Sequence, residues 1–164
     1  MSRTIILTGA AGKFGKVLVK YFIENGDKVI AIGRSKKSLN KLKKNYHGNG
    51  NNLFLIEANL MSKSSYQIIA KVIKRKKLKP DCLINNARDL KNLKMNKHGE
   101  ISEDNFLNEL KLGVVVPYEL STKLVKLFKN SLRNIVNIGS IYGSVVPNTK
   151  LYKKLTDNVP ISYG

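Results

Sequence analysis

The residues with the clearest chemical potential form a glycine-rich segment near the N-terminus. Gly9, Gly12 and Gly15 follow a short apolar run, and Lys13 and Phe14 lie between the last two glycines. Glycines permit a tight turn and the close approach of a phosphate group, and a helix that begins there offers unpaired N–H groups with a partial positive charge. The spacing predicts a site for the pyrophosphate of a dinucleotide. An ordinary turn between a strand and a helix is the alternative.

A second chemical signal lies at the end of the next apolar run, which spans Lys28 to Ile32. In dinucleotide-binding folds an acidic residue at this position accepts a hydrogen bond from the 2′-hydroxyl of NAD. This sequence has no acidic residue there and carries Arg34 instead. Because a guanidinium pairs well with a 2′-phosphate, Arg34 favours NADP over NAD. The alternative is that Arg34 is one more surface cation in a basic chain.

The hydrophobic pattern predicts the elements that position these residues. Five short apolar runs, each typical of a buried strand, alternate with four segments of helical period. The strands are expected at 3–8, 28–32, 53–57, 81–84 and 133–138, and the helices at 12–25, 36–45, 65–77 and 104–130. Strands separated by helices pair in parallel, so the sequence predicts an α/β fold with a Rossmann-like, doubly wound sheet. The polar stretch 89–102 is expected to form a surface loop.

Length and composition restrict the class of protein. With 164 residues, 42% of them hydrophobic, the chain is expected to form one domain over residues 1–164. No apolar run has the length of a membrane helix, and no cleavable leader is expected before the first strand. Cys82 is the single cysteine, which excludes an internal disulfide and a thiolate metal cluster. These features predict a cytoplasmic protein without a metal site and without membrane association.

The formal net charge of +19 raises nucleic acid as a candidate partner. Most of the excess is lysine, and two runs without acidic residues, 34–44 and 71–79, fall largely on predicted surface helices. Solvated helix faces explain this pattern more simply than a phosphate-binding surface does. A nucleic-acid partner is therefore not favoured.

Further motifs follow the glycine-rich segment in a fixed order. Asn85, Asn86 and Ala87 come directly after the fourth expected strand, Ser140 follows the fifth, and Tyr163 lies next to the last residue of the sequence. Taken together, these motifs resemble the short-chain dehydrogenase/reductase family over essentially the whole chain. The resemblance implies an oxidoreductase that transfers hydride between NADP or NAD and a small alcohol or carbonyl substrate.

The resemblance also implies roles for individual residues. Cofactor contacts would come from Gly9, Gly12, Lys13, Phe14, Gly15, Arg34, Asn59, Asn86 and Ala87. Ser140 would hydrogen-bond the substrate oxygen and Tyr163 would donate a proton, because hydride addition to a carbonyl builds negative charge on its oxygen. Tyr152 is a second candidate donor by its spacing from Ser140, and Tyr142 is the poorest one.

The sequence departs from the family pattern at several positions. Lys13 stands where the commoner branch has a glycine, and Arg88 replaces the glycine that completes Asn-Asn-Ala-Gly. Asn59 replaces an aspartate, and Gly113 aligns with an asparagine of the long fourth helix. Neither Tyr152 nor Tyr163 is followed after four residues by the family's lysine. These departures leave a non-catalytic nucleotide-binding or regulatory protein as the alternative.

Family members normally continue beyond the fifth strand. The chain is therefore expected to be the N-terminal two-thirds of such a protein, with the sheet truncated after that strand. The fifth strand would then form an edge that exposes apolar side chains. The helix expected at 104–130 would lie in the surface through which family members form homo-oligomers.

Overall fold

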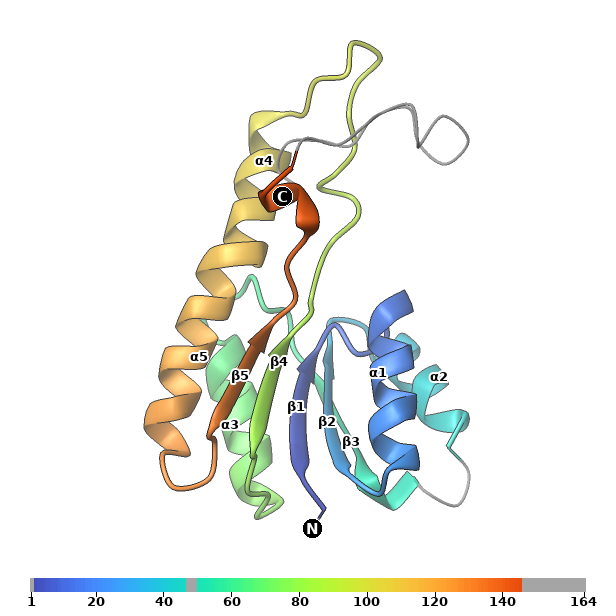
Figure 1. Ribbon diagram of the computed structural model, residues 1–164, viewed down its shortest axis with the longest axis vertical. Helices are drawn as coiled ribbons and strands as arrows, with labels where there is room; N and C mark the ends of the chain where they lie inside the picture. Colours follow the sequence, from blue (N-terminus) through green and yellow to red (C-terminus); the bar gives the residue numbers. More distant parts are fainter. Residues whose placement is uncertain (1, 47–49, 146–164) are drawn as a thin grey trace.

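A parallel five-stranded sheet forms the centre of the molecule (Figure 1), in a computed structural model that describes residues 2–46 and 50–145. The strands are β1 (Thr4–Thr8), β2 (Lys28–Gly33), β3 (Leu53–Glu57), β4 (Cys82–Asn85) and β5 (Asn134–Asn137). Their order is β3-β2-β1-β4-β5, and every neighbouring pair is parallel. The chain therefore winds outward from β1 in both directions, which confirms the predicted Rossmann-like, doubly wound fold.

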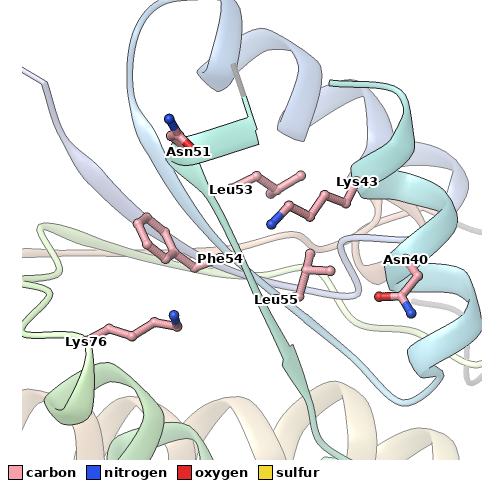
Figure 2. Close-up of a pocket in the computed structure, with 7 residues that line it drawn as sticks. All are labelled: Asn40, Lys43, Asn51, Leu53, Phe54, Leu55 and Lys76. Atoms are coloured by element: carbon pink, nitrogen blue, oxygen red, sulfur yellow. The ribbon is translucent and has the colours of Figure 1, made fainter. Parts of the chain in front are cut away.

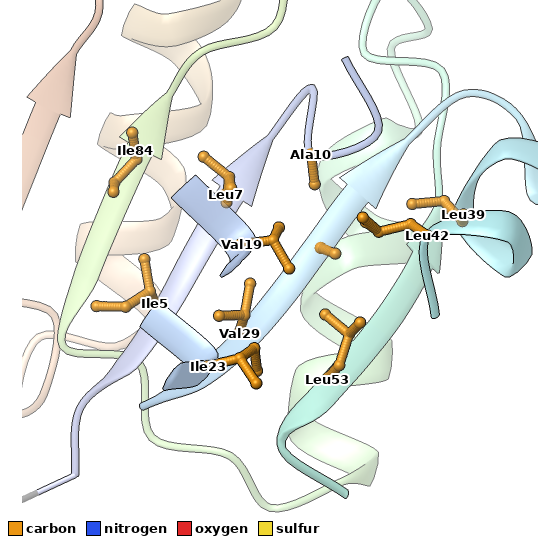
Figure 3. Close-up of a cluster of buried hydrophobic side chains, with 11 residues drawn as sticks. Ile5, Leu7, Ala10, Val19, Ile23, Val29, Leu39, Leu42, Leu53 and Ile84 are labelled. Carbon is orange, nitrogen blue, oxygen red and sulfur yellow. The ribbon is translucent and has the colours of Figure 1, made fainter. Parts of the chain in front are cut away.

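Helices cover both faces of the sheet because each strand is apolar on both sides. The helices α1 (Lys13–Glu24) and α2 (Lys36–Lys44) pack on one face, and α3 (Ser65–Arg75) and α5 (Val116–Leu127) on the other. Figure 3 shows the first of these two cores, in which Ile5 and Leu7 of β1 meet Val19 and Ile23 of α1. Ile6, between them, lies in the second core. Alternate residues of one strand thus hold both layers in place.

The helix expected at 104–130 starts within one residue of the predicted position, at Glu103, but ends earlier than predicted and is not one regular α-helix. It runs as α4 (Glu103–Leu110), a π-helical turn (Lys111–Val115) and α5, which ends at Leu127. Pro117 lies in the first turn of α5 and has no N–H to donate to the carbonyl of Gly113, which accounts for the irregular turn at that position. Phe128 then leaves helical geometry, with φ −116° and ψ 32°.

The strand β5 forms an edge of the sheet, as the sequence predicts. All four of its residues are exposed, and the apolar side chains of Ile135 and Val136 remain 41% accessible. Ile138, just after the strand, is 43% exposed. Among the residues that the structure describes, neither face of β5 is covered as fully as the faces of the inner strands, whose side chains are nearly all buried.

A buried carboxylate joins the start of β1 to the turn before β2, and it predicts how stability depends on pH. Asp27 is 4% exposed in its side chain and accepts hydrogen bonds from the Arg3 backbone N–H at 2.9 Å and from its guanidinium at 2.6 Å. Burial alone would raise the pKa of Asp27, but the hydrogen bonds from Arg3 outweigh it and lower the pKa. This stabilisation is present above the unfolded-state pKa and is lost as the pH falls through the lower folded-state pKa.

We therefore expect Asp27→Asn to lower the melting temperature at neutral pH and the difference from wild type to close on acidification. Thermal denaturation of both proteins between pH 7 and about pH 3 measures this gap. Glu24→Gln, which changes an exposed carboxylate on α1, is the matched control. A gap that stays constant down to the acid limit would show that Asp27 acts through packing and not through its charge.

Candidate nucleotide site

The turn between β1 and α1 requires glycine at two positions. Gly9 has a φ of +65°, and a Cβ at this position would lie 2.8 Å from the Cα of Ala87. A Cβ on Gly15 would lie 2.2 Å from the carbonyl oxygen of Gly9. The first turn of α1 therefore packs directly on the backbone of the loop before it. The structure brings the glycines of the sequence motif together as a single tight turn.

The N-terminus of α1 can receive a phosphate group. Gly12 is the N-cap residue, and no side chain caps the helix. The first turn contains no acidic residue, and Lys13 and Phe14 are exposed. The N–H groups at the start of a helix have no intrahelical acceptor and favour an anion. The residues present therefore fit a pyrophosphate, and a Cβ or a capping carboxylate would oppose it.

The segment after β4 holds this turn in place. The hydroxyl oxygen of Thr8 accepts hydrogen bonds from the N–H groups of Asn86 at 2.9 Å and of Ala87 at 3.0 Å. The side-chain amide of Asn86 donates to the carbonyl oxygens of Thr8 at 3.0 Å and of Gly9 at 3.3 Å. Thr8 was not among the predicted site residues, although its place between the strand and Gly9 is the signal that could have identified it. Asn86 and Ala87 lie beside the glycine turn, as the predicted site requires.

Asn85 connects β4 to the strand that carries Ser140. Its buried amide donates to the side-chain oxygen of Asn137 at 2.8 Å and to the hydroxyl of Ser121 on α5 at 3.2 Å. Ser140 follows β5 and begins the short 3₁₀-helix Ile141–Gly143, where its hydroxyl oxygen accepts from the N–H of Tyr142 at 3.2 Å. Since all strands are parallel, Ser140 and the glycine turn lie at the same carboxyl edge of the sheet.

Two of the candidate proton donors cannot be placed. Tyr152 and Tyr163 both lie outside the described residues. Asn59 follows β3 and is exposed, with its side-chain oxygen accepting a hydrogen bond from the N–H of Met61 at 3.1 Å. This contact shapes the turn after β3 and leaves the side-chain nitrogen of Asn59 as a donor.

Arg34 forms an ion pair that the sequence did not predict. Its guanidinium nitrogens contact both carboxylate oxygens of Asp89, with Nη2 and Oδ1 3.1 Å apart. The hydrogen bonds that Arg34 donates to Asp89 lower the pKa of Asp89 and raise the pKa of Arg34. Arg34 therefore has a specific partner and is not a freely solvated cation. Asp89 lies at the start of the polar stretch that was expected only as a surface loop.

Arg88, the residue before Asp89, makes a second ion pair, with a residue of α4. Arg88 donates from Nε to the carboxylate of Glu109 on α4. The Glu109 side chain is 2% exposed, and within residues 2–46 and 50–145 its Oε2 atom has no hydrogen-bond partner. Neither residue was predicted as a site residue. The signal was Arg88 itself, a long cation where the family pattern has glycine.

A cavity of about 430 Å³ lies away from this edge of the sheet. Figure 2 shows it beside the first residues of β3, and its lining consists of Asn40, Lys43, Asn51, Leu53, Phe54, Leu55 and Lys76. The glycine turn and the residues after β2 and β4 do not line it.

In the described part of the chain, no group of three or more His, Cys, Asp or Glu residues could hold a metal ion. No helix in that part is long and apolar enough to cross a membrane.

Comparison with known proteins identifies the family. The family model described as short chain dehydrogenase matches residues 3–153. The chain belongs to this family. The match includes the glycine turn, the segment after β4 and Ser140, and it confirms the resemblance that the motifs predict.

Individual short-chain dehydrogenases show the same relationship. An NADPH-dependent pterin aldehyde reductase of Arabidopsis thaliana is 32% identical over 113 residues, which cover 69% of this chain and 46% of that protein. An NADP-dependent 3-hydroxy acid dehydrogenase of Escherichia coli K12 is 26% identical over 141 residues, or 85% of this chain and 55% of that protein. The closed form of a serine dehydrogenase complexed with NADP⁺ superimposes with a TM-score of 0.75 at 25% identity, over 88% of this chain and 56% of that one. The chain spans about half the length of the curated relatives it matches.

Proposed function

We propose that this short-chain dehydrogenase binds NADP(H) in preference to NAD(H) and acts on an alcohol or carbonyl group of a small molecule. The observation that carries the proposal is the arrangement at the carboxyl edge of the sheet, where the open N-terminus of α1 lies beside the end of β2, which Arg34 directly follows. Relatives named for NADPH or NADP dependence, and a solved neighbour complexed with NADP⁺, support it. A small-molecule substrate, without nucleic acid, is part of the same proposal.

The residues of the turn would hold the nucleotide. The N–H groups of Lys13, Phe14 and Gly15, at the start of α1, would donate hydrogen bonds to the pyrophosphate, and the positive charge of Lys13 favours the same anion. Arg34 would pair with the 2′-phosphate through its planar fork. Asn59 and Ala87, after β3 and β4, would lie along the adenosine side. The nicotinamide, when bound, supplies or accepts the hydride.

Ser140 and Tyr163 would act on the substrate oxygen. A hydroxyl has one hydrogen to donate and two lone pairs. Ser140 uses one lone pair to accept from the N–H of Tyr142, so its hydrogen is available for an oxygen that gains negative charge. Tyr163 would give a proton to the same oxygen in reduction and remove it in oxidation. This assignment of roles rests on the family order of motifs.

The proposal extends to location and assembly. A single cysteine, Cys82, whose pKa burial raises, fits a reducing cytoplasm. The long helix leaves Leu107, Val114 and Tyr118 more than half exposed. Apolar side chains of this size at a surface favour association, and we propose a homo-oligomer through the helix at 103–127.

Arg34→Ala tests the cofactor preference. We expect the variant to lose NADPH affinity by about 10- to 100-fold, because charged hydrogen bonds of this kind contribute about 1.5–3 kcal/mol each. NADH affinity should change less than about twofold, since NADH has no group for Arg34 to read. Fluorescence titration of the reduced nicotinamide with the full 164-residue chain measures both constants.

The control for that titration is Arg75→Ala. Arg75 is exposed in the last turn of α3, which leads to the amino end of β4 and so to the opposite edge of the sheet. The Arg75→Ala substitution removes the same charge as Arg34→Ala, but far from the proposed position of the 2′-phosphate. An equal loss for NADPH and NADH in Arg34→Ala, or the same NADPH loss in Arg75→Ala, would overturn the assignment of Arg34.

A further inference from the structure

The guanidinium of Arg34 is paired with a carboxylate of its own chain. Both oxygens of Asp89 contact its two terminal nitrogens, which is the side-by-side geometry that an arginine offers equally to a carboxylate or a phosphate. The carboxylate side chain is 16% exposed, and that of Arg34 is 60% exposed. An anion that arrives from solvent therefore reaches Arg34 directly, but it meets donors that Asp89 already uses.

The topology places this ion pair across the candidate nucleotide site. In the sheet, β1 lies between β2 and β4. Arg34 follows β2 and Asp89 follows the β4 segment, so the pair spans the carboxyl end of β1, where the glycine turn begins. Arg34 and Ala87, which would contact the 2′-phosphate and the adenosine side of a dinucleotide, belong to these same two segments. The Arg34–Asp89 pair therefore lies where the 2′-phosphate of NADP would have to bind to reach Arg34.

The neighbouring ion pair holds Asp89 in position. Arg88 is fixed to Glu109 of α4, and Asp89 is the next residue in the chain. Because Arg88 and Asp89 are consecutive and pair with α4 and with the residue after β2, the two ion pairs together restrain the backbone that carries Asp89. Asp89 also accepts a hydrogen bond from the N–H of Lys91 at 3.2 Å, which orients its carboxylate.

We propose that Asp89 is a specificity-determining residue. Its carboxylate competes with the 2′-phosphate of NADP for the hydrogen bonds that the Arg34 guanidinium donates. This inference rests on the proposed function, because it assigns the 2′-phosphate to Arg34. A phosphate carries more negative charge than a carboxylate, so it displaces Asp89, but the exchange costs part of its binding free energy. A nucleotide with a 2′-hydroxyl makes no such exchange. Asp89 thus weakens NADPH binding selectively and narrows the difference between the two cofactors.

Asp89→Asn tests the proposal with probes that contain only the recognised part of the cofactor. Adenosine 2′,5′-bisphosphate and adenosine 5′-monophosphate differ in the 2′-phosphate alone, and calorimetry measures both without turnover. We expect the affinity of the variant for the bisphosphate to rise by about three- to tenfold, because a neutral amide competes less well for the guanidinium. Affinity for the monophosphate should stay within about twofold, since Arg34 does not contact it.

Three further variants complete the experiment. Asp104→Asn removes one exposed carboxylate from the start of α4 and is the matched control for net charge. In an Arg34→Ala background the gain from Asp89→Asn should vanish, because the competition requires the guanidinium. Asp89→Ser serves as a second substitution if the asparagine variant does not fold, as judged by circular dichroism.

The outcomes separate this inference from the proposed function. A gain for the bisphosphate that depends on Arg34 supports the competition. The competition is overturned if both Asp89 variants bind the bisphosphate no better than wild type, if Asp104→Asn shows an equal gain, or if the gain persists in the Arg34→Ala background. In each of these cases, a large loss of bisphosphate affinity in Arg34→Ala would still support the cofactor preference. If Arg34→Ala binds the bisphosphate as well as wild type does, the assignment of the 2′-phosphate fails, and this inference fails with it.

Discussion

Replacement of Gly15 by alanine is expected to abolish nucleotide binding and to destabilise the fold. A Cβ at this position would lie 2.2 Å from the carbonyl oxygen of Gly9 and 2.9 Å from the Cα of Ala10. Both are backbone atoms, so no side chain can rotate away. The helix α1 would have to move off the loop, and its N–H groups would no longer face the position of the pyrophosphate. Overpacking of this kind costs about 1–3 kcal/mol.

We expect Gly15→Ala to lose NADPH and NADH affinity alike, by about 100-fold or more, because the pyrophosphate is common to both. Titration of both cofactors and urea unfolding provide the two measurements. Gly113→Ala is the matched control, since its Cβ would meet no atom within 4 Å and alanine favours a helix over glycine by about 0.5–1 kcal/mol. Wild-type affinity in Gly15→Ala would show that the turn relaxes freely and that the glycine is not required.

The architecture could be predicted from the sequence because its determinants are local. Strands such as β1, with Ile5, Ile6 and Leu7 in succession, are short apolar runs, and a helix-length segment separates each strand from the next, which leaves parallel pairing as the outcome. The π-helical turn at Lys111–Val115 was missed because the apolar period continues through it. Pro117 was the available signal, since a proline four residues after Gly113 removes one helical hydrogen bond.

The candidate site likewise contains one part that the local sequence predicts and one part that it does not. The glycine turn depends on residues close together in the sequence, so spacing alone predicted it. The partner of Arg34 lies 55 residues away, in a stretch with no periodicity, and only the crossing of the chain from β4 back toward β2 brings Asp89 to it. Glu109 is one acidic residue on an amphipathic helix, and nothing in its neighbours distinguishes it from a solvated one. Ion pairs across a fold are set by tertiary structure, which the local pattern does not contain.

Removal of Arg88 is expected to destabilise the protein more than the loss of any surface ion pair. The Arg88→Met variant would remove the cation that pairs with Glu109, whose side chain is 2% exposed and so has little access to water. Breaking a buried pair from one side costs about 3–5 kcal/mol, because the remaining charge is not compensated. Methionine keeps most of the length of the side chain, so the change isolates the guanidinium from the packing of its stem. Urea unfolding of the full chain measures the difference.

Replacing both partners should restore most of that loss. In Arg88→Met/Glu109→Leu no charge remains buried, and exchanging a buried ion pair for apolar residues of similar size is often close to neutral. Lys123→Met is the control for an exposed pair, since the Lys123–Glu119 bridge lies on the surface of α5 and should contribute less than about 1 kcal/mol. A double variant as unstable as Arg88→Met would contradict the account, because the cost would then lie in the shape of the arginine and not in the charge of Glu109. Recovery in the double variant would instead identify Arg88 as the counter-charge that permits a buried acidic residue on α4.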